Sequence, residues 1–591
     1  MQILAPTMCA GRPRSLFPLL LSVQQVPVED LSSDTYGDVV NVIRSYGLRP
    51  ARARGNMRAF EGPISVGGTT IRIRFEISDW DFETYPHARL LDDFPDGHRI
   101  YAHIDATGGL CYFTPESIIL DRYRPWDAVN QCLHAIESVL TKALARDSNA
   151  DADIQSEFVA YWAFGQLPPA KSVVVDELAA GATEASYFSF DGPDADHRAL
   201  ICENSEHAGK LITALGYNQS IELAYTCFLF ASDKTPTAPR GAFPATIREL
   251  LSWIATWDRS MLRDIRARLA TSKGYLKQKR CVLAFSTPIG RFGIEFAHDA
   301  RHRLGYQRNP AHYCNFLHGE KGGQTAITRL KLDDIGASYI HSRNLGFESL
   351  VGKRIRLIGC GAIGGYLAAS LVRLGAGTGD GGQLFLCDPG VLEPGNLGRH
   401  TLGFSSLFRN KADALRSELV RQFPYLNIIS DPVAQSYNDQ FFATDLVIDA
   451  TGNEAHSEKL NFFHVKHRLC PVLYVRIRGN GECVQTLLSD SERFACFRCL
   501  RQADGGNYRD ERHPVLGSVP ITRFRGCASF TPYAVSSALS AAALATDVVI
   551  DWLKGHSTPR FRTRRIENAD VRQFSNQDLS PLKKCPACQS S

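Results

Sequence analysis

A strand that runs into a glycine-rich turn and then a helix constrains this chain more than any other feature. The segment RIRLIGCGAIGG begins at Arg354, carries Gly359, Gly361 and Gly364, and continues into an Ala- and Leu-rich stretch typical of a helix. The backbone N–H groups of such a turn and the dipole of the helix can together hold a phosphate group. The pattern predicts an α/β domain with a nucleotide site.

The polar residues that follow narrow the kind of nucleotide. Asp388 ends the next predicted strand, QLFLCD, where its carboxylate can accept hydrogen bonds from ribose hydroxyls. Up to this point an NAD(P) oxidoreductase fits equally well. Asn396, Arg399 and Lys411 then supply one polar and two cationic groups within a short span. A triphosphate needs that charge while an acyl group attacks its α-phosphate, so the series favours adenylation with ATP.

This order of motifs resembles the ubiquitin-activating enzymes and the bacterial sulfur-carrier adenylyltransferases of the ThiF type. GCGAIGG matches their glycine-rich loop, LCDPGVLEPGNLGRH their ribose-binding Asp with Asn-Leu-x-Arg, and RNKA their catalytic lysine segment. The resemblance implies ATP and Mg²⁺ as cofactors. It also implies that Arg343, in YIHSRN, reaches the ATP of the partner subunit in a homodimer. An unrelated dinucleotide-binding domain is the alternative.

One position departs from that family. Its members usually carry a second Asp in D-x-x-D-N after the fourth strand, and this Asp helps to hold Mg-ATP. Here LVIDATGN provides Asp449 and Asn453, with Gly452 in the expected Asp position. Two interpretations stay open: Asp449 reaches the metal through a different loop shape, or phosphate and water hold the metal. Gly452 also supports a third possibility, a non-catalytic scaffold that retains the fold.

Four cysteines form two closely spaced pairs, Cys496-x-x-Cys499 and Cys585-x-x-Cys588. Four thiolates on two such turns suit tetrahedral Zn²⁺ in a closed structural site. The 85 residues between the pairs exceed the gap of a small zinc ribbon, so a frayed thiol tail is the alternative. ThiF-type adenylyltransferases carry a zinc clip of this layout, and the resemblance therefore implies zinc.

Cys527 is the first of two candidate reactive cysteines. It lies in RFRGCASFTPYAV, with Arg523 and Arg525 before it and a predicted long helix that begins near Thr531-Pro532. A thiol between arginines and a helix N-terminus should have a lowered pKa and more thiolate. In ubiquitin-activating enzymes a cysteine of this crossover segment takes the acyl group from the adenylate, and the resemblance implies that role here. A buried structural cysteine is the alternative.

Cys111 is the second candidate. FEGPISV and TTIRIRFEI are typical of strands joined by Gly67-Gly68, Tyr85-Pro86 follows, and GGLC ends at Cys111 before a helical stretch. Together with EFVAYW further on, this order resembles a ubiquitin-conjugating domain. The resemblance implies that Cys111 carries an acyl group as a thioester. An ordinary core cysteine in a domain that only binds partners is the alternative.

This second resemblance is incomplete at the tripeptide His-Pro-Asn. His103-Ile104-Asp105 stands in its region, with His103 eight positions before Cys111. The oxyanion contribution of the missing Asn then comes from elsewhere or is absent. We hypothesise that His103 supports the loop and that Asp105 helps to deprotonate an incoming amine.

The motifs divide the 591 residues into three expected domains. Residues 1–166 are a ubiquitin-conjugating-like α+β domain, and residues 336–591 a Rossmann-like ThiF/ubiquitin-activating adenylation domain. Between them, residues 167–335 form a mixed linker and dimerisation domain without a chemical signature, in which FPATIRELLSWIATWDRSMLRDIRARLA is strongly helical. The expected fold class is multidomain, with α+β and α/β parts.

Composition argues against some partners. A net charge of +4 is too mild for the concentrated basic face of a protein that binds nucleic acid directly. We find no uninterrupted apolar run of the roughly 18 residues that a membrane span needs. The 16 cysteines include only two C-x-x-C pairs, which fits a reducing compartment. We expect a cytoplasmic protein with no membrane contact.

A conjugating and an activating module in one chain resemble the CD-NTase-associated ubiquitin-transferase-like fusions of anti-phage CBASS systems. That family implies a transferase and ligase that adenylates the C-terminus of a cGAS/DncV-like nucleotidyltransferase. The acyl group would pass from Cys527 to Cys111 and then to a lysine of a target protein. The alternatives are a sulfur-carrier adenylyltransferase, an NAD(P) oxidoreductase and a non-catalytic scaffold.

Overall fold

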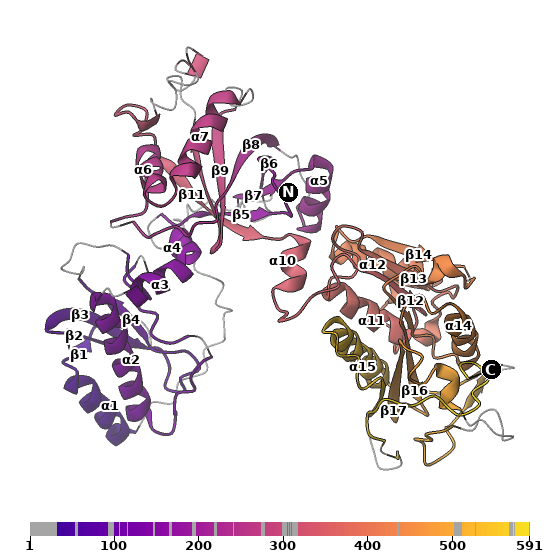
Figure 1. Ribbon diagram of the computed structural model, residues 1–591. Coiled ribbons are helices and arrows are strands. Elements are labelled where there is room, and N and C mark those ends of the chain that lie inside the picture. Colours follow the sequence, from indigo (N-terminus) through magenta and orange to yellow (C-terminus); the bar gives the residue numbers. More distant parts are fainter. Residues whose placement is uncertain are drawn as a thin grey trace, which may run out of the picture.

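The computed structural model shows three lobes that follow one another along the chain (Figure 1). It describes residues 32–53, 57–92, 100–105, 107–114, 116–145, 148–164, 168–191, 197–217, 222–239, 241–272, 278–297, 304, 306–307, 309, 317–433, 436–501, 511–525, 528–566, 571–572 and 574–589. The domain limits expected from the sequence, near residues 166 and 335, stay a proposal.

The first lobe is an antiparallel meander of strands with two helices packed against it. Its strands pair in chain order, and the hairpin at Gly67-Gly68 has the positive φ angles that glycine tolerates. The elements are α1 (Ser33–Ser45), β1 (Arg49–Ala51), β2 (Arg58–Val66), β3 (Thr69–Ile77), β4 (His87–Leu90) and α2 (Pro125–Ala145). Alternate residues of β3, among them Ile73 and Phe75, are buried in one core with Val129 of α2.

The segment between β4 and α2 carries Cys111. Its described residues form isolated bridges in place of a strand: Ile104 pairs with Leu110, and Arg89 of β4 pairs with Gly109. After α2 come α3 (Ser148–Ser156) and α4 (Phe158–Phe164). Phe158 and Trp162 of α4 are buried in the core of the second lobe, so α4 connects the two lobes by packing as well as by chain.

The second lobe is a closed barrel with strand order β10-β11-β5-β7-β6-β8-β9. Its elements are β5 (Lys171–Val175), β6 (Glu184–Asp191), β7 (His197–Cys202), α5 (Ser205–Ala214), β8 (Glu222–Ala231), α6 (Ile247–Trp257), α7 (Arg259–Thr271), β9 (Arg280–Thr287), β10 (Gly290–Ala297) and β11 (Ile327–Asp334). The stretch FPATIRELLSWIATWDRSMLRDIRARLA, which was predicted to be helical, forms two helices, α6 and α7. Asp258 interrupts it, because its extended backbone ends α6 and its carboxylate accepts the N–H of Ser260 and Met261 in α7.

The third lobe is built on a mixed sheet with strand order β14-β13-β12-β15-β16-β17-β20. The first five strands in that order are parallel, and β17 and β20 are antiparallel additions. The strands are β12 (Arg354–Ile358), β13 (Gln383–Cys387), β14 (Ile428–Asp431), β15 (Leu446–Asp449), β16 (Val472–Arg478), β17 (Cys483–Ser489) and β20 (Phe561–Arg565). The α/β fold expected for this region is confirmed by the ThiF family match reported below.

Helices cover both faces of this sheet. The helical elements are α10 (Ala337–Ser342), α11 (Ala362–Arg373), η2 (Pro394–Asn396), η3 (Phe404–Ser406), α12 (Lys411–Gln422), α13 (Asp439–Phe442), α14 (Glu454–His467), η4 (Phe497–Leu500) and α15 (Val535–Leu553). Leu357 of β12 joins a core with α11, α12 and α15. Its neighbour Ile358 joins the opposite core with α13, α14 and η4, as the two-residue period of a strand requires.

Helix α15 is long and apolar enough to cross a membrane by length and composition. The sequence prediction of no membrane-length apolar run missed this helix. Part of its surface is buried within the lobe, where Ala541, Ala545 and Val548 share a core with α11. A core helix of a folded domain passes the same test, so its composition alone assigns it no membrane role.

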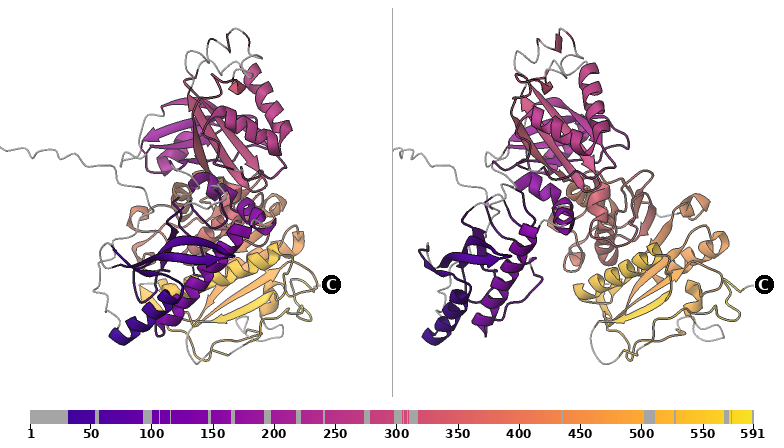
Figure 2. Two further views of the ribbon diagram at one scale, coloured as in Figure 1. Left: turned by 90° about the vertical axis from the view of Figure 1, so that its left-hand side faces the viewer. Right: turned by 60° about the vertical axis from the view of Figure 1, so that its left-hand side comes forward.

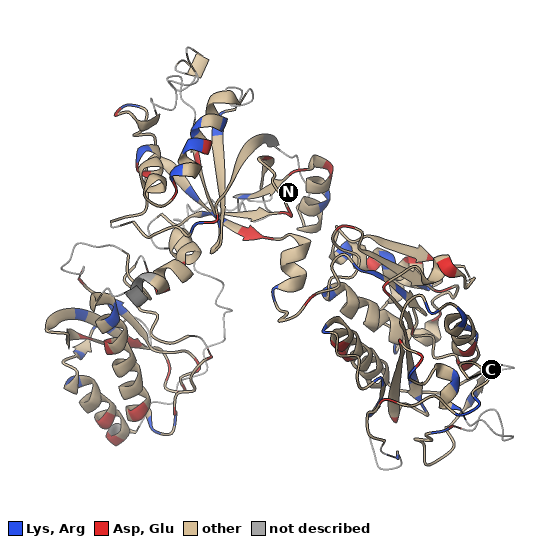
Figure 3. Ribbon diagram, in the orientation of Figure 1, with Lys and Arg blue, Asp and Glu red and all other residues tan. Residues whose placement is uncertain are grey.

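Two junctions hold the three lobes together. Further views show the barrel above the other two lobes (Figure 2), and α4 and α10 lie at its lower end, toward the first and the third lobe (Figure 1). Lys and Arg are interspersed with Asp and Glu over all three lobes (Figure 3). Because the first and third lobes are separate, Cys111 of the first lobe and the predicted nucleotide-binding residues of the third lobe lie in different parts of the molecule.

Candidate active sites

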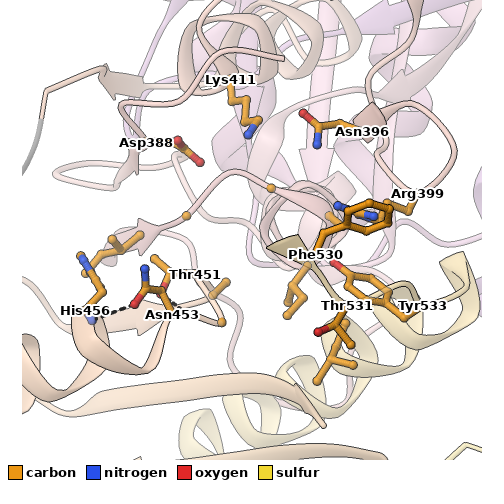
Figure 4. A pocket seen from close by; sticks show the side chains of 18 of the residues that line it. Asp388, Asn396, Arg399, Lys411, Thr451, Asn453, His456, Phe530, Thr531 and Tyr533 are labelled. Atoms are coloured by element: carbon orange, nitrogen blue, oxygen red, sulfur yellow. Dashed lines mark hydrogen bonds between the residues drawn. The ribbon is translucent and has the colours of Figure 1, made fainter. Parts of the chain in front are cut away.

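A cavity of about 760 Å³ lies at the carboxyl ends of β12, β13 and β15 (Figure 4). The strand order reverses at β12, which is where open α/β sheets bind their ligands. Of the residues predicted to bind nucleotide, the described lining includes Gly359, Gly361, Asp388, Asn396, Arg399 and Lys411. Folding thus brings residues from four separate segments to one cavity.

The glycine loop has the shape that a close ligand requires. Gly359 has a φ of +87°, and a Cβ there would lie 2.8 Å from the backbone nitrogen of Thr451. A Cβ on Gly364 would lie 1.7 Å from the carbonyl oxygen of Gly359, so only glycine lets α11 pack this closely. Gly361, which precedes α11, has no atom within 4 Å of its ideal Cβ position. Its open side leaves room for a phosphate beside the helix N-terminus.

The carboxylate of Asp388 is oriented by the backbone around it. Its Oδ2 accepts the N–H of Cys360 at 2.7 Å, and its Oδ1 accepts the N–H of Gly390 at 2.7 Å. Asn396 is oriented similarly, because its Oδ1 accepts the N–H of Glu393 at 3.0 Å. Each carboxylate oxygen of Asp388 keeps a lone pair, which can accept a ribose hydroxyl.

Lys411 is tied to the Asp388 turn although it lies 23 residues later in the chain. The Asn410 amide donates to the carbonyl oxygen of Asp388 at 2.8 Å, and the Lys411 N–H donates to that of Gly390 at 2.9 Å. Lys411 is also the first residue of α12. These bonds hold the lysine and the aspartate at one end of the cavity.

Arg399 stands over an aromatic ring that sequence reasoning missed. Its guanidinium carbon lies 4.9 Å from the ring centroid of Tyr533, which a segment after β19 (Ala528–Phe530) supplies.

The neighbouring His400 is buried, accepts the N–H of Leu402 at 3.0 Å on Nδ1, and therefore donates from Nε2 to the carbonyl oxygen of Cys360 at 2.8 Å. Burial lowers the pKa of His400, which keeps it neutral in that bond. The sequence signal that could have found His400 was its place directly after Arg399 in the motif NLGRH.

Asp449 and Gly452 occupy different positions relative to this cavity. Asp449 ends β15 fully buried, and it is not among the lining residues described. Its Oδ1 accepts the N–H and hydroxyl of Thr451, and its Oδ2 accepts the hydroxyl of Ser457 at 2.5 Å. Gly452 lines the cavity with a φ of +63° and open space at its Cβ position. A role of Asp449 in holding Mg²⁺ stays a prediction.

Arg343 lies outside the described cavity lining. It caps the C-terminal end of α10, its side chain is exposed, and its guanidinium carbon lies 5.9 Å from the ring centroid of Tyr339. The predicted contact of Arg343 with the ATP of a second subunit stays a prediction.

The four paired cysteines meet in space. Sγ of Cys496 lies 3.8 Å from that of Cys499 and 3.9 Å from that of Cys585, and Cys499 lies 3.5 Å from Cys588. A tetrahedron with Zn–S bonds of about 2.3 Å has S–S edges of about 3.8 Å, so the thiols fit zinc. Asn461 supports the first turn, because its Oδ1 accepts the N–H of Phe497 at 2.9 Å. The buried cluster differs from the frayed tail considered as the alternative.

Cys527 lies outside the described residues. The strands on either side of it, β18 (Arg523–Arg525) and β19, pair antiparallel, and Phe530 of β19 lines the cavity. The following helix begins later than predicted: α15 starts at Val535, without a side-chain cap. Asn480 holds the preceding segment, because its amide donates to the carbonyl oxygen of Pro532 at 3.0 Å. Helix α15 starts eight residues after Cys527 in the sequence, and the effect of its N-terminus on that thiol stays a prediction.

Cys111 is exposed and opens onto a groove of about 1040 Å³ that includes Ile119 and Tyr123. The Cys111 N–H donates to the carbonyl oxygen of His103 at 2.8 Å. His103 adopts a φ of +61°, and its own N–H donates to the Tyr161 hydroxyl at 2.6 Å. Although the residue as a whole is exposed, its thiol is partly buried, and this burial, followed by nearby carboxylates, raises the pKa of Cys111 above its ordinary value of 9.0.

Comparison with known proteins identifies the family. The model of the ThiF family matches residues 338–589, and that of prokaryotic E2 family B matches residues 51–166. An ATP-dependent ubiquitin transferase-like protein Cap2 of Pseudomonas aeruginosa (strain BWHPSA011 / Pa011) is 31% identical over 87% of this chain and 91% of that relative. The chain belongs to the Cap2 family. Cap2 of Escherichia coli (strain TW11681) is 26% identical over 84% of this chain and 87% of the relative.

Membership of the Cap2 family makes this chain an enzyme of the ubiquitin-activating and ubiquitin-conjugating-like type. The predicted resemblance and fold class are thereby confirmed, and the family description implies ATP. Among solved structures, E. coli MccB with MccA-N7isoASN covers 41% of this chain and 68% of its own, at 16% identity and a TM-score of 0.31.

The raised pKa of Cys111 predicts how this Cap2 family member reacts with pH. Only the thiolate attacks an alkylating reagent, and a pKa above 9.0 leaves little thiolate at neutral pH. Alkylation of Cys111 by iodoacetamide should therefore rise about tenfold for each pH unit from 7 to 9, without levelling off. Mass spectrometry of the Cys111 peptide after timed reaction measures this rate. A plateau below pH 8.5 would contradict the expected shift.

Proposed function

We propose that this enzyme adenylates the C-terminal carboxylate of a partner protein with ATP and passes the acyl group from Cys527 to Cys111. A lysine amine of a target protein then takes it as an amide. One observation carries the proposal: Phe530 and Tyr533, three and six residues after Cys527 in the sequence, line the same cavity as the glycine loop and Lys411. An adenylate made there forms beside the segment that follows the proposed nucleophile in the chain.

The residues of the cavity suit each group of ATP. Gly361 leaves room for phosphate, Asp388 can accept the ribose hydroxyls, and the cavity volume is ordinary for a small-molecule ligand. A carboxylate oxygen of the partner attacks the α-phosphorus, and pyrophosphate leaves. Arg399 and Lys411 offset the negative charge that this step concentrates. Mg²⁺ belongs to the proposal, and the two interpretations of its site stay open: Asp449 reaches the metal, or phosphate and water hold it.

The relay divides one difficult acyl transfer into three easier steps. The Cys527 thiolate attacks the adenylate carbonyl carbon, and AMP leaves. The Cys111 thiolate then attacks the same carbon, and the Cys527 thiolate leaves. An amine finally replaces Cys111 and gives the amide. Because the cavity and Cys111 belong to different lobes, the middle step needs the lobes to approach or a second copy of the chain.

The family suggests the biological partners. We propose that a cGAS/DncV-like nucleotidyltransferase supplies the C-terminus, in cytoplasmic anti-phage defence, and that two copies of the chain form a homodimer. Arg343, exposed at the end of α10, would then contact the ATP of the partner subunit. The domains proposed for these tasks are residues 1–166, 167–335 and 336–591.

Exchange of labelled pyrophosphate into ATP tests the adenylation step. With a cGAS/DncV-like nucleotidyltransferase present, Lys411→Ala should lower exchange by about 10²- to 10³-fold, as loss of one preorganised charge-stabilising group does. Arg421→Ala, at the other end of α12, is the matched control, because Arg421 is exposed and pairs only with neighbours such as Glu418. Unchanged exchange in Lys411→Ala would remove the lysine from the mechanism. Binding of reduced nicotinamide in place of ATP would support an oxidoreductase.

A further inference from the structure

We propose that Glu157, and not Asp105, is the catalytic carboxylate that receives the proton of the incoming amine at Cys111. This inference rests on the proposed function, because it concerns how an acyl group leaves Cys111.

The carboxylate of Asp105 is engaged within its own turn. Its Oδ1 accepts the N–H and the hydroxyl of Thr107, both at 2.7 Å, and the N–H of Gly109 at 2.9 Å. A Cβ on Gly109 would lie 2.4 Å from Oδ2 of Asp105, so the chain also crowds the second oxygen. Three donors already occupy the lone pairs of Oδ1, so this oxygen has no free site for the proton of an amine. Asp105 therefore shapes the turn that precedes Cys111.

Glu157 reaches the Cys111 loop from another part of the chain. It lies between α3 and α4, and its Oε1 is 3.7 Å from Nδ1 of His103. Tyr161, one helical turn further on, accepts the backbone N–H of His103 at 2.6 Å. The carbonyl oxygen of the same His103 accepts the N–H of Cys111. The junction of α3 and α4 thus holds His103 at two points, and His103 holds Cys111.

The side chain of Glu157 is 44% exposed, so it can meet a substrate amine. Its charge also acts at the thiol: after burial, Glu157 and then Asp105 raise the pKa of Cys111. Asp153 provides a contrast. It lies 3.8 Å from the other ring nitrogen of His103, on Nε2, and it is not among the described carboxylates that shift this pKa. The titratable groups around Glu157 are therefore His103, Asp153, Tyr161, Asp105 and Cys111.

Two protons leave the lysine nitrogen in this step. The lysine ammonium gives the first to the Glu157 carboxylate, and the freed amine attacks the thioester carbonyl carbon. A C–N bond forms as the C–S bond breaks, the departing Cys111 thiolate takes up the second proton from the nitrogen, and Glu157 passes the first to water. The negative charge of Glu157 also attracts the positively charged lysine before the proton moves. A positioned base of this kind typically contributes about 10²- to 10⁴-fold.

A discharge experiment on the full chain tests this role. A glycine-terminated peptide thioester charges Cys111 in a Cys527→Ala background, and free lysine then releases the peptide at pH 7.5. Glu157→Gln should slow release by lysine at least 10-fold, and Glu157→Asp should recover part of the rate. Asp153→Asn is the matched control and should release at the parent rate. At pH 9.5 the slowing caused by Glu157→Gln should be smaller than at pH 7.5, because more of the lysine is already deprotonated.

Two further readouts separate base catalysis from damage to the loop. Hydroxylamine, whose nitrogen is uncharged at pH 7.5, should release the peptide from Glu157→Gln at the parent rate. Iodoacetamide should alkylate Cys111 faster in the same variant when no peptide is attached to the thiol, because loss of the negative charge of Glu157 lowers the pKa of that thiol.

Each adverse outcome has its own meaning. Release by lysine at the parent rate in Glu157→Gln would overturn the inference. Equal slowing with lysine and hydroxylamine would also overturn it, because Glu157 would then only support the loop. A parent chain that takes up no peptide on Cys111 would refute the proposed function itself, whatever Glu157 does.

Discussion

Cys111→Ala should abolish the amide-linked product while pyrophosphate exchange and an acyl thioester on Cys527 persist. The variant removes the sulfur that holds the acyl group in the last covalent intermediate, so product should fall below detection. Cys527→Ala should remove both thioesters and the product and leave pyrophosphate exchange intact. Non-reducing electrophoresis with mass spectrometry of the two cysteine peptides distinguishes these states.

Two variants make this relay test sharper. Cys111→Ser should trap the acyl group as an oxygen ester that survives thiol reagents, because a hydroxyl is a poorer leaving group than a thiol. Cys132→Ala, in the buried face of α2, is the control and should keep making product. Normal product from Cys111→Ala would remove the first lobe from the chemistry. A sulfur-carrier adenylyltransferase would behave in that way.

Removal of zinc should produce the largest effect on stability. The chain from residue 574 onwards returns to the third lobe, where the Leu582 N–H meets Sγ of Cys499 at 3.3 Å and Cys585 is fully buried. Zinc held by four thiolates contributes about 10 to 16 kcal/mol in small zinc domains. Cys585→Ser or a strong chelator should therefore release this end of the chain and lower the melting temperature of the third lobe.

Elemental analysis and calorimetry check this expectation, with one zinc per chain as the predicted content. Cys470→Ala is the matched control, because Cys470 is buried in the same core cluster and lies outside the four-thiol group. It should keep its zinc and lose only a small part of its stability. A metal-free wild-type chain with an unchanged melting temperature would leave the four thiols as a packing cluster.

Features encoded over a few residues were predictable from the sequence. The glycine positions follow from local backbone needs, and the structure shows them: Gly359 at positive φ and Gly364 against the carbonyl oxygen of Gly359. The thiols of Cys496 and Cys499 also lie side by side, at 3.8 Å, because the pair is a short turn. The alternation of apolar residues in the strand that ends at Ile77 likewise gave a meander.

Features that depend on packing between distant segments were not predictable. The helix expected at Thr531 begins at Val535, because Asn480 holds the intervening segment and Tyr533 meets Arg399. Residues of the EFVAYW segment belong to the barrel core, where the Trp162 indole donates to the carbonyl oxygens of Gly293 and Leu330. No local pattern states which neighbour a helix will meet.

By itself the sequence determined the fold class and the kind of chemistry, because glycine spacing, strand periodicity and thiol pairs act through near neighbours. Only the tertiary structure decided which carboxylate meets His103, the residue that holds Cys111. Asp105 is close in sequence and is engaged in its own turn, whereas Glu157 lies 46 residues away from Cys111. Glu157 comes to the His103 ring because Phe158 and Trp162 anchor α4 in the barrel, and that contact exists only once the chain has folded.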